Sequence, residues 1–274
     1  MKSKRWLICL KLLAALAGAA AAAFAGHWCA QRILAHAFES SGLTGENLAD
    51  APGYLRFAAR NTGTLTMCVS MLVCIAALLF LRDMFGKTEV RFRVKWLALL
   101  IFAAVIGIGL VTILRNADEI RNAPQRSYGN AAEYALAALL PCALALLIRG
   151  CIYKGAKDAF GLWTALAVSA VAEGGLCLLI YGTSVPVFIN GMIFSALACL
   201  VYESNASLWP EILLRFGFAA GARLLCGYPN GGAYYVSGSL WAGAEKGTEG
   251  SLTLTILLAM VCVFVYLYRR KQHG

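Results

Sequence analysis

The sequence predicts an all-α membrane protein, a polytopic transmembrane helix bundle of about eight spans. Of its 274 residues, 60% are hydrophobic and only 14% are charged, whereas about a quarter of the residues are charged in soluble domains. The mean hydropathy is +0.70. Apolar stretches recur along the chain, each roughly 18–22 residues long, which is enough to cross about 30 Å of hydrocarbon.

The predicted spans and the distribution of basic residues together indicate an orientation. We expect spans near residues 6–26, 62–82, 96–115, 131–149, 161–181, 184–202, 208–226 and 251–268. Eight spans place both termini on one side, and 15 of the 24 Lys and Arg residues fall on that side against seven on the other. Because basic residues concentrate in cytoplasmic loops, we expect both termini in the cytoplasm and the chain in the plasma membrane. This asymmetry accounts for the net charge of +10 without a nucleic-acid partner.

The spans divide the chain into two parts and a tail. Residues 1–130 hold three spans and an outer stretch at 27–61, where "HWCAQRILAHAF" carries apolar residues at helical spacing. Two interpretations stay open: an amphipathic helix lying on the outer surface, or a short helix packed over the bundle. Residues 131–268 hold five spans with tight connections and one Gly- and Tyr-rich outer loop at 227–250, which we interpret as a cap over a cavity. Residues 269–274 form a basic cytoplasmic tail.

The first apolar segment is similar to a secretory signal, because it follows a basic start and contains "AGAAAAAFAG", which is typical of a cleavage region. Its removal would leave seven spans and break the charge asymmetry. We therefore expect the segment to be retained as the first membrane helix.

The ten cysteines do not predict a metal centre or a cofactor. Most of them lie in the predicted spans, and no CxxC or Cys/His metal spacing occurs. Cys29 and Cys226 fall near the same predicted face, but their spacing gives no support for a disulfide.

Polar residues in or near the spans are the best indicators of a functional site in a membrane protein. They are few: Glu133, Arg149, Glu173, Asn190, Arg215 and Arg223. Glu133, Arg149 and Arg223 lie close enough to span ends for their side chains to reach the interface. Glu173 and Arg215 lie deeper, where an isolated charge costs a few kcal/mol. We expect these two side chains to face one interior and pair, since Glu173 is the only deep acid on this interpretation.

The distribution of the other chemically reactive residues excludes several kinds of active site. None of the three His residues and none of the four Asp residues lies in a predicted span. The spans therefore hold no His/Glu metal set, no aspartyl dyad and no Ser–His pair. The chain also lacks a GxGxxG motif and a P-loop.

Three stretches resemble signatures of the CAAX-processing and bacteriocin-immunity intramembrane endopeptidases, the CPBP or Abi family. "PCALALLIRGCIYK" (141–154) resembles the first signature, and "SLWPEILLRFGFA" (207–219) resembles the late one. "GSLWAGAEKGTEGSL" (238–252) resembles the Gly-rich segment before the last helix of many bacterial members. The resemblance covers about residues 138–268 and implies a CPBP-like five-helix core there.

The catalytic residues of that family are absent at the equivalent positions. Its two glutamates, two histidines and late asparagine correspond here to Leu144, Ala145, Cys177, Arg215 and Ala219. Arg149 and Gly150 of the first signature are kept, and Glu173 stands where the family has a Phe. The resemblance implies that positions 173, 177, 215 and 219 converge on one interior cavity. General-base catalysis needs a group that can take a proton near working pH, and Leu, Ala and Arg cannot supply one.

The leading interpretation is a pseudoprotease that binds a peptide, a lipid or a partner membrane protein in the former active-site cavity. We expect the cavity residues to be Arg149, Glu173, Asn190 and Arg215. One alternative is an active endopeptidase with Glu173 as a relocated base, although an adjacent guanidinium would occupy that carboxylate. Another is a small-solute transporter gated by Glu173 and Arg215, although the sequence shows no inverted repeat of the kind found in many transporters.

Overall fold

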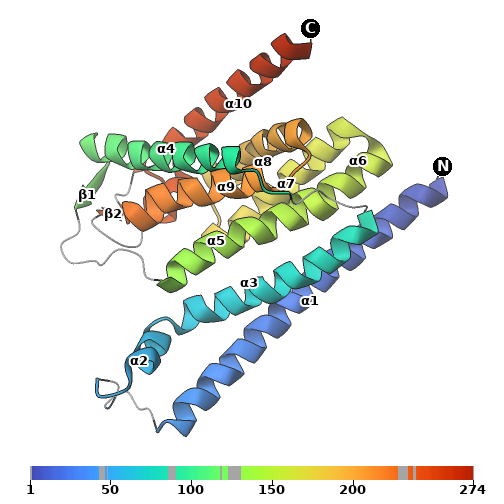
Figure 1. The fold of residues 1–274 in the computed structure, drawn as a ribbon. Helices are drawn as coiled ribbons and strands as arrows, with labels where there is room; N and C mark the ends of the chain where they lie inside the picture. Colours follow the sequence, from blue (N-terminus) through green and yellow to red (C-terminus); the bar gives the residue numbers. More distant parts are fainter. Residues whose placement is uncertain are drawn as a thin grey trace.

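The protein is a bundle of long helices, as seen in a computed structural model (Figure 1). The structure describes residues 2–42, 47, 49–85, 91–117, 119–122, 131–227, 234–236 and 239–273. The α-helices are α1 (Lys2–Ser40), α2 (Gly53–Arg60), α3 (Thr62–Leu81), α4 (Leu97–Asn116), α5 (Ala131–Ala145), α6 (Lys154–Phe160), α7 (Leu162–Tyr181), α8 (Val185–Asn205), α9 (Trp209–Ala219) and α10 (Leu252–His273). The π-helical turns are η3 (Leu146–Tyr153) and η4 (Ala220–Leu225), and the 3₁₀ turns are η1 (Arg82–Phe85), η2 (Val94–Trp96) and η5 (Ala244–Gly250).

Each of the eight predicted spans is helical, but six helices in the described part of the chain are long and apolar enough to cross a membrane. They are Trp6–Ser40, Thr62–Leu81, Val94–Asn116, Ala131–Phe160, Leu162–Tyr181 and Val185–Asn205. The predicted span at 208–226 is shorter, with eleven residues in α9 and six in η4, and it carries three charges. The apolar part of α10 is also short, Leu252–Leu267. A helical bundle is therefore confirmed, and its described part holds six candidate membrane spans rather than the eight predicted.

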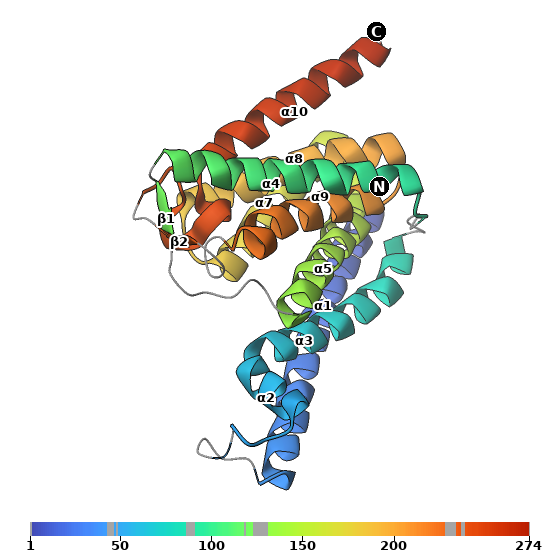
Figure 2. The same cartoon turned by 60° about the vertical axis from the view of Figure 1, so that its left-hand side comes forward.

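The N-terminal helix differs from the prediction in its length. The segment 27–38, expected as a separate surface or packed helix, continues α1 without a break through Ser40. No Gly or Pro interrupts residues 27–40, so nothing in this stretch ends the helix. At 1.5 Å per residue, the 39 residues of α1 reach about 58 Å, which is nearly twice the hydrocarbon thickness. Figures 1 and 2 show α1 and α3 side by side as a long hairpin, with α10 projecting away from the bundle.

The hydrophobic core crosses the predicted domain boundary at residue 130. One buried cluster joins Ala15 of α1 and Leu78 of α3 to Ala145 of α5 and Tyr202 of α8. A second cluster brings α4 together with α8, η4 and α10. The first three long helices therefore pack into the same core as the later ones. The predicted basic tail continues α10, which extends through His273.

Glycines allow two pairs of helices to approach closely. A Cβ at Gly107 of α4 would lie 2.7 Å from a carbonyl oxygen of α9, and Gly217 and Gly221 meet the backbone of α4 from the other side. Gly174 of α7 lies against α8 in the same way, where a Cβ would be 2.8 Å from the Phe188 ring. Such small-residue contacts are typical of helix pairs in membranes. They hold α9 against α4 and α7 against α8, and so position the polar residues of α7 and α9.

A short sheet ties together the connections at one end of the bundle. β1 (Ile120–Asn122) follows α4, and β2 (Tyr234–Val236) belongs to the Gly- and Tyr-rich segment before α10. The strands pair antiparallel, with Ile120 opposite Val236. This pairing fixes part of the predicted outer loop beside the end of α4.

Candidate functional site

Four charged side chains form a closed ring of ion pairs inside the bundle. Arg215 binds the Glu173 carboxylate directly, and Arg149 Nη2 lies 3.3 Å from the other Glu173 oxygen. Glu211 joins the same two arginines: its Oε1 lies 3.1 Å from Arg215 Nη2, and its Oε2 lies 3.4 Å from Arg149 Nε. We call Arg149, Glu173, Arg215 and Glu211 the charge ring. Acids and bases alternate around it, so its net charge is zero.

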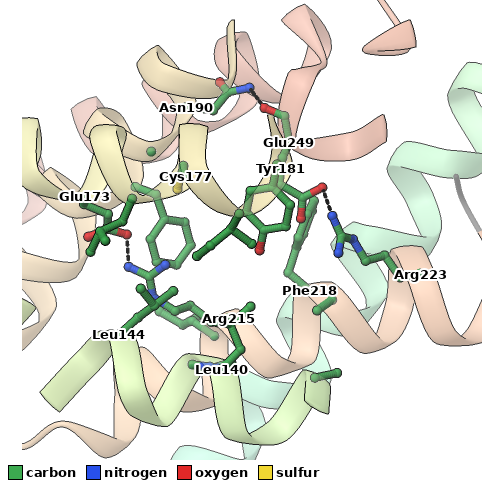
Figure 3. Close-up of a pocket in the computed structure, with 18 of the residues that line it drawn as sticks. Leu140, Leu144, Glu173, Cys177, Tyr181, Asn190, Arg215, Phe218, Arg223 and Glu249 are labelled. Carbon is green, nitrogen blue, oxygen red and sulfur yellow. Dashed lines mark hydrogen bonds and ion pairs between the residues drawn. The ribbon is translucent and has the colours of Figure 1, made fainter. Parts of the chain in front are cut away.

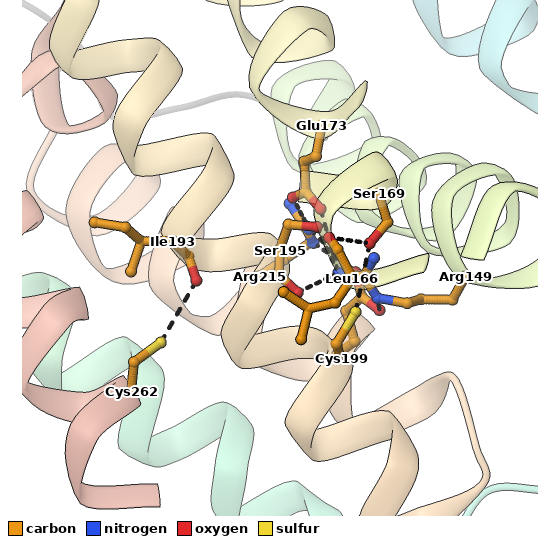
Figure 4. A network of polar contacts seen from close by, with 10 residues as sticks. Arg149, Leu166, Ser169, Glu173, Ile193, Ser195, Cys199, Arg215 and Cys262 are labelled. Carbon is orange, nitrogen blue, oxygen red and sulfur yellow. Dashed lines mark hydrogen bonds and ion pairs between the residues drawn. The ribbon is translucent and has the colours of Figure 1, made fainter. Parts of the chain in front are cut away.

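The charge ring is almost completely removed from solvent. The side chains of Arg149 and Glu173 are 0% exposed, Glu211 is 1% exposed and Arg215 is 11% exposed. Arg149 Nη2 also donates to the Ser195 carbonyl at 2.8 Å and to its hydroxyl at 3.2 Å. Figure 4 shows Arg149, Glu173, Ser195 and Arg215 converging from different helices. Buried charges persist in this way only when they are paired.

Local helix geometry brings each member of the ring to this point. Arg149 lies in the π-helical turn η3, whose wider turns occur often at functional sites. Glu211 and Arg215 are four residues apart on α9 and therefore lie on the same helix face. The start of α9 is itself buried, because Ser207 donates to the Arg91 carbonyl at 3.2 Å and Leu208 is 0% exposed.

The predicted contact between Glu173 and Arg215 is present in the structure, but two other predictions about the buried charges were wrong. Arg149 was expected to reach the membrane interface from the end of a span. Instead, the helix continues through η3 and α6 to Phe160, so Arg149 lies within the helix and is buried. Glu173 was expected to be the only deep acid, yet Glu211 is equally buried. The four-residue spacing of Glu211 and Arg215 was a signal in the sequence that could have identified this second acid.

An interior cavity of about 790 Å³ lies beside the charge ring. Its lining is mainly apolar and comes from α3, α4, α5, α7, α8, α9 and α10. Several of the predicted site residues line it: Leu144, Glu173, Cys177, Asn190, Arg215 and Ala219. Ala145 and Arg149 do not. Ala145 packs in the first hydrophobic cluster, and Arg149 is sequestered behind Glu173 by its bonds to Ser195.

A second polar group lies at another part of the cavity wall. Arg223 Nη2 is 2.5 Å from Glu249 Oε2, and the Arg223 guanidinium lies 4.7 Å from the centre of the Tyr181 ring. The Asn190 amide nitrogen donates to the Glu249 carbonyl at 2.8 Å and to the Ser251 carbonyl at 3.1 Å. Figure 3 shows this group and the Glu173–Arg215 pair on either side of a largely apolar space.

The predicted outer loop at 227–250 contributes to this wall. Lys246 and Glu249 of η5 line the cavity, as expected of a loop that covers it. Residues 228–233 and 237–238 of the loop lie outside the described residues. Cys29 and Cys226, considered as a disulfide, are both free thiols.

The site combines paired carboxylates with a cavity of the size of a ligand pocket. Among the described residues, no group of three or more His, Cys, Asp or Glu side chains could hold a metal ion. Both oxygens of Glu173 are engaged by guanidinium groups. The cavity volume lies within the range of about 300–1,000 Å³ typical of ligand pockets.

The fold and the site together define a helical membrane bundle with a paired charge ring beside an apolar cavity. Comparison with known proteins adds no relative: no family model, curated protein or solved structure matches this chain.

Proposed function

We propose that this chain is a catalytically inactive member of the CAAX-processing and bacteriocin-immunity endopeptidase family that binds an apolar or amphipathic ligand in its interior cavity. In this proposal the family-equivalent residues have lost their catalytic role while the cavity has been kept. The short helices α9 and α10 would complete an eight-helix, CPBP-like domain in a bacterial plasma membrane, with both termini in the cytoplasm.

The cavity is the observation that carries the proposal. Leu144, Cys177, Arg215 and Ala219 come from three separate helices, α5, α7 and α9, and all four line it. These are four of the five positions at which the family resemblance expects catalytic side chains. An apolar cavity of about 790 Å³ with a few polar groups at its edges is the usual form of a small-molecule site.

The burial and the ion pairs of Glu173 argue against the endopeptidase alternative. A general base must reach a water molecule and accept its proton. The Glu173 side chain is 0% exposed, and its two oxygens contact Arg215 and Arg149. To act as a base, Glu173 would have to give up both contacts and leave Glu211 as the only acid for two guanidinium groups in the protein interior, which is strongly unfavourable.

Ligand binding is tested by filling the cavity. Purified protein at a fixed detergent concentration is offered tritiated oleyl alcohol, an uncharged apolar chain, in a scintillation proximity assay. We expect saturable binding by the wild-type protein and its loss in Leu140→Trp, because Leu140 lines the cavity. The matched control is Val263→Trp on α10, where the side chain is 57% exposed and lies outside the cavity lining. Equal binding by all three proteins would contradict the proposal.

Catalytic inactivity is tested separately with prenylated and unprenylated peptides. We expect no cleavage above a protein-free blank. Cleavage by the wild-type protein that disappears in Glu173→Gln would overturn the proposal and establish Glu173 as a relocated base.

A further inference from the structure

One cation at the cavity wall has no counter-charge among the described residues. Lys246 of η5 lines the cavity and is partly exposed. Within the described part of the chain, its ammonium group makes neither an ion pair nor a side-chain hydrogen bond. The group lies over Gly182, where an added Cβ would come within 2.5 Å of Lys246 Nζ. The positive charge is therefore available at the cavity wall.

Among the side chains that the structure describes, the neighbouring charges do not neutralise Lys246. Arg223 and Glu249 form a pair with each other, and the Arg223 guanidinium also covers the Tyr181 ring. Glu133 lines the cavity from α5 but is engaged in an interaction of its own. Arg223, Glu249 and Lys246 together carry one net positive charge on the side of the cavity away from the neutral charge ring.

The wall between these two polar regions is largely apolar. Leu140, Leu144 and Phe218 all line the cavity, and Figure 3 shows Phe218 near the Arg223–Glu249 pair and Leu144 beside Arg215. The cavity also reaches the molecular surface, because Leu179 belongs to its lining and is 83% exposed. A site with an apolar interior, one uncompensated cation at its wall and access from the surface is complementary to an anionic amphiphile.

We propose that the cavity binds a single-chain amphiphile with an anionic head group, a carboxylate or a phosphate. The head group pairs with Lys246, and the apolar tail lies among Leu140, Leu144 and Phe218. This inference rests on the proposed function, since it names the class of ligand for the same cavity. It adds a preference that an apolar cavity alone would not have, namely for a ligand with a negative charge at one end of its apolar chain.

A purely structural role for Lys246 makes a different prediction. Gly182 follows the last residue of α7, and a cation near a helix C-terminus interacts favourably with the helix dipole. If that were its only role, replacing Lys246 would lower thermal stability and leave the preference for a charged head group unchanged. The preference is therefore the decisive measurement.

The experiment compares tritiated oleate with tritiated oleyl alcohol, which share one chain and differ in head-group charge. Binding is measured in the scintillation proximity assay for the wild-type protein and for Lys246→Gln. The control is Lys95→Gln, because Lys95 is exposed and outside the cavity lining. A parallel titration with unlabelled oleyl phosphate as competitor tests whether a phosphate replaces the carboxylate. Sodium acetate, which has the charge but no tail, tests whether the head group alone suffices.

We expect the wild-type protein and Lys95→Gln to prefer oleate over the alcohol. We expect Lys246→Gln to lose about tenfold in oleate affinity, the contribution of one charge-assisted contact, with alcohol affinity unchanged. Displacement of oleate by oleyl phosphate would show that a phosphate head group also binds. Displacement of oleate by acetate would contradict the need for an apolar tail. Equal affinity of the wild-type protein for oleate and the alcohol would overturn the inference while leaving the proposed function intact. If the wild-type protein bound neither oleate nor oleyl alcohol, the proposed function itself would be overturned.

Discussion

Breaking the charge ring at Glu173 is the most direct test of its role in stability. Glu173→Gln leaves Glu211 as the only acid for two arginines, Arg149 and Arg215, of which Arg149 is 0% exposed. Removing one partner of a buried ion pair costs roughly 3–5 kcal/mol, because the remaining charge is uncompensated. We expect a loss of that size in the free energy of unfolding, and a similar loss for Arg215→Met.

Two double variants separate charge balance from packing. Glu173→Gln combined with Arg215→Met leaves Arg149 facing Glu211 at 3.4 Å, so the remaining buried charge is zero. This variant should be more stable than the sum of the single losses predicts, by about 1–3 kcal/mol, as residues in direct contact show. Glu173→Gln combined with Glu211→Gln leaves two guanidinium groups and no acid. That variant should be the least stable of the set.

The measurement is equilibrium unfolding in mixed micelles of dodecyl maltoside and dodecyl sulfate, followed by tryptophan fluorescence. The free energies of the single and double variants then form a double-mutant cycle. Additivity of Glu173→Gln and Arg215→Met within about 0.5 kcal/mol would show that the two residues are not energetically coupled. That result would refute the conclusion that Glu173 and Arg215 stabilise the protein as a directly contacting pair.

Three further predictions concern packing, surface charge and orientation. Gly107→Val should lose about 1–3 kcal/mol of stability in the same unfolding assay, because its Cβ would meet a carbonyl oxygen of α9 at 2.7 Å. The matched Gly109→Val faces open space and should lose clearly less; equal losses would exclude the helix contact as the cause. Lys157→Met breaks an ion pair whose lysine is 41% exposed and should cost less than about 1 kcal/mol, so a loss as large as that of Glu173→Gln would contradict the role assigned to burial. In a cysteine-depleted background, Leu240→Cys should react with an impermeant maleimide added outside intact cells and Lys95→Cys should not, and the reverse pattern would invert the orientation.

The sequence was sufficient to predict the helical elements and one contact of the site. Long apolar segments determine where membrane helices form, and each predicted segment is helical. The high cost of an isolated charge in the membrane was also enough to pair Glu173 with Arg215. The family resemblance, and not this cost, led to the prediction that Cys177 and Ala219 lie at one cavity with them.

The positions of the other two members of the charge ring, Arg149 and Glu211, could not be predicted from hydropathy. Arg149 lies near the end of an apolar segment, and no local pattern indicated that the helix would continue through a π-helical turn. Glu211 follows Pro210 at the start of α9, which is a position typical of a membrane interface. The structure buries that helix start under neighbouring segments. Burial of a helix end is determined by tertiary packing, and neither span length nor local propensity specifies it.

The arrangement of the charge ring along the chain has a consequence for biosynthesis. Arg149 and Glu173 lie on consecutive spans, Ala131–Phe160 and Leu162–Tyr181, while Glu211 and Arg215 lie one helical turn apart on α9. If the helices insert in chain order, the Arg149–Glu173 pair comes together within one hairpin, and the Glu211–Arg215 pair comes together later within α9. Each pair is neutral by itself, so neither needs the other to balance its charge. The charge ring can then close by the meeting of two electrically neutral units.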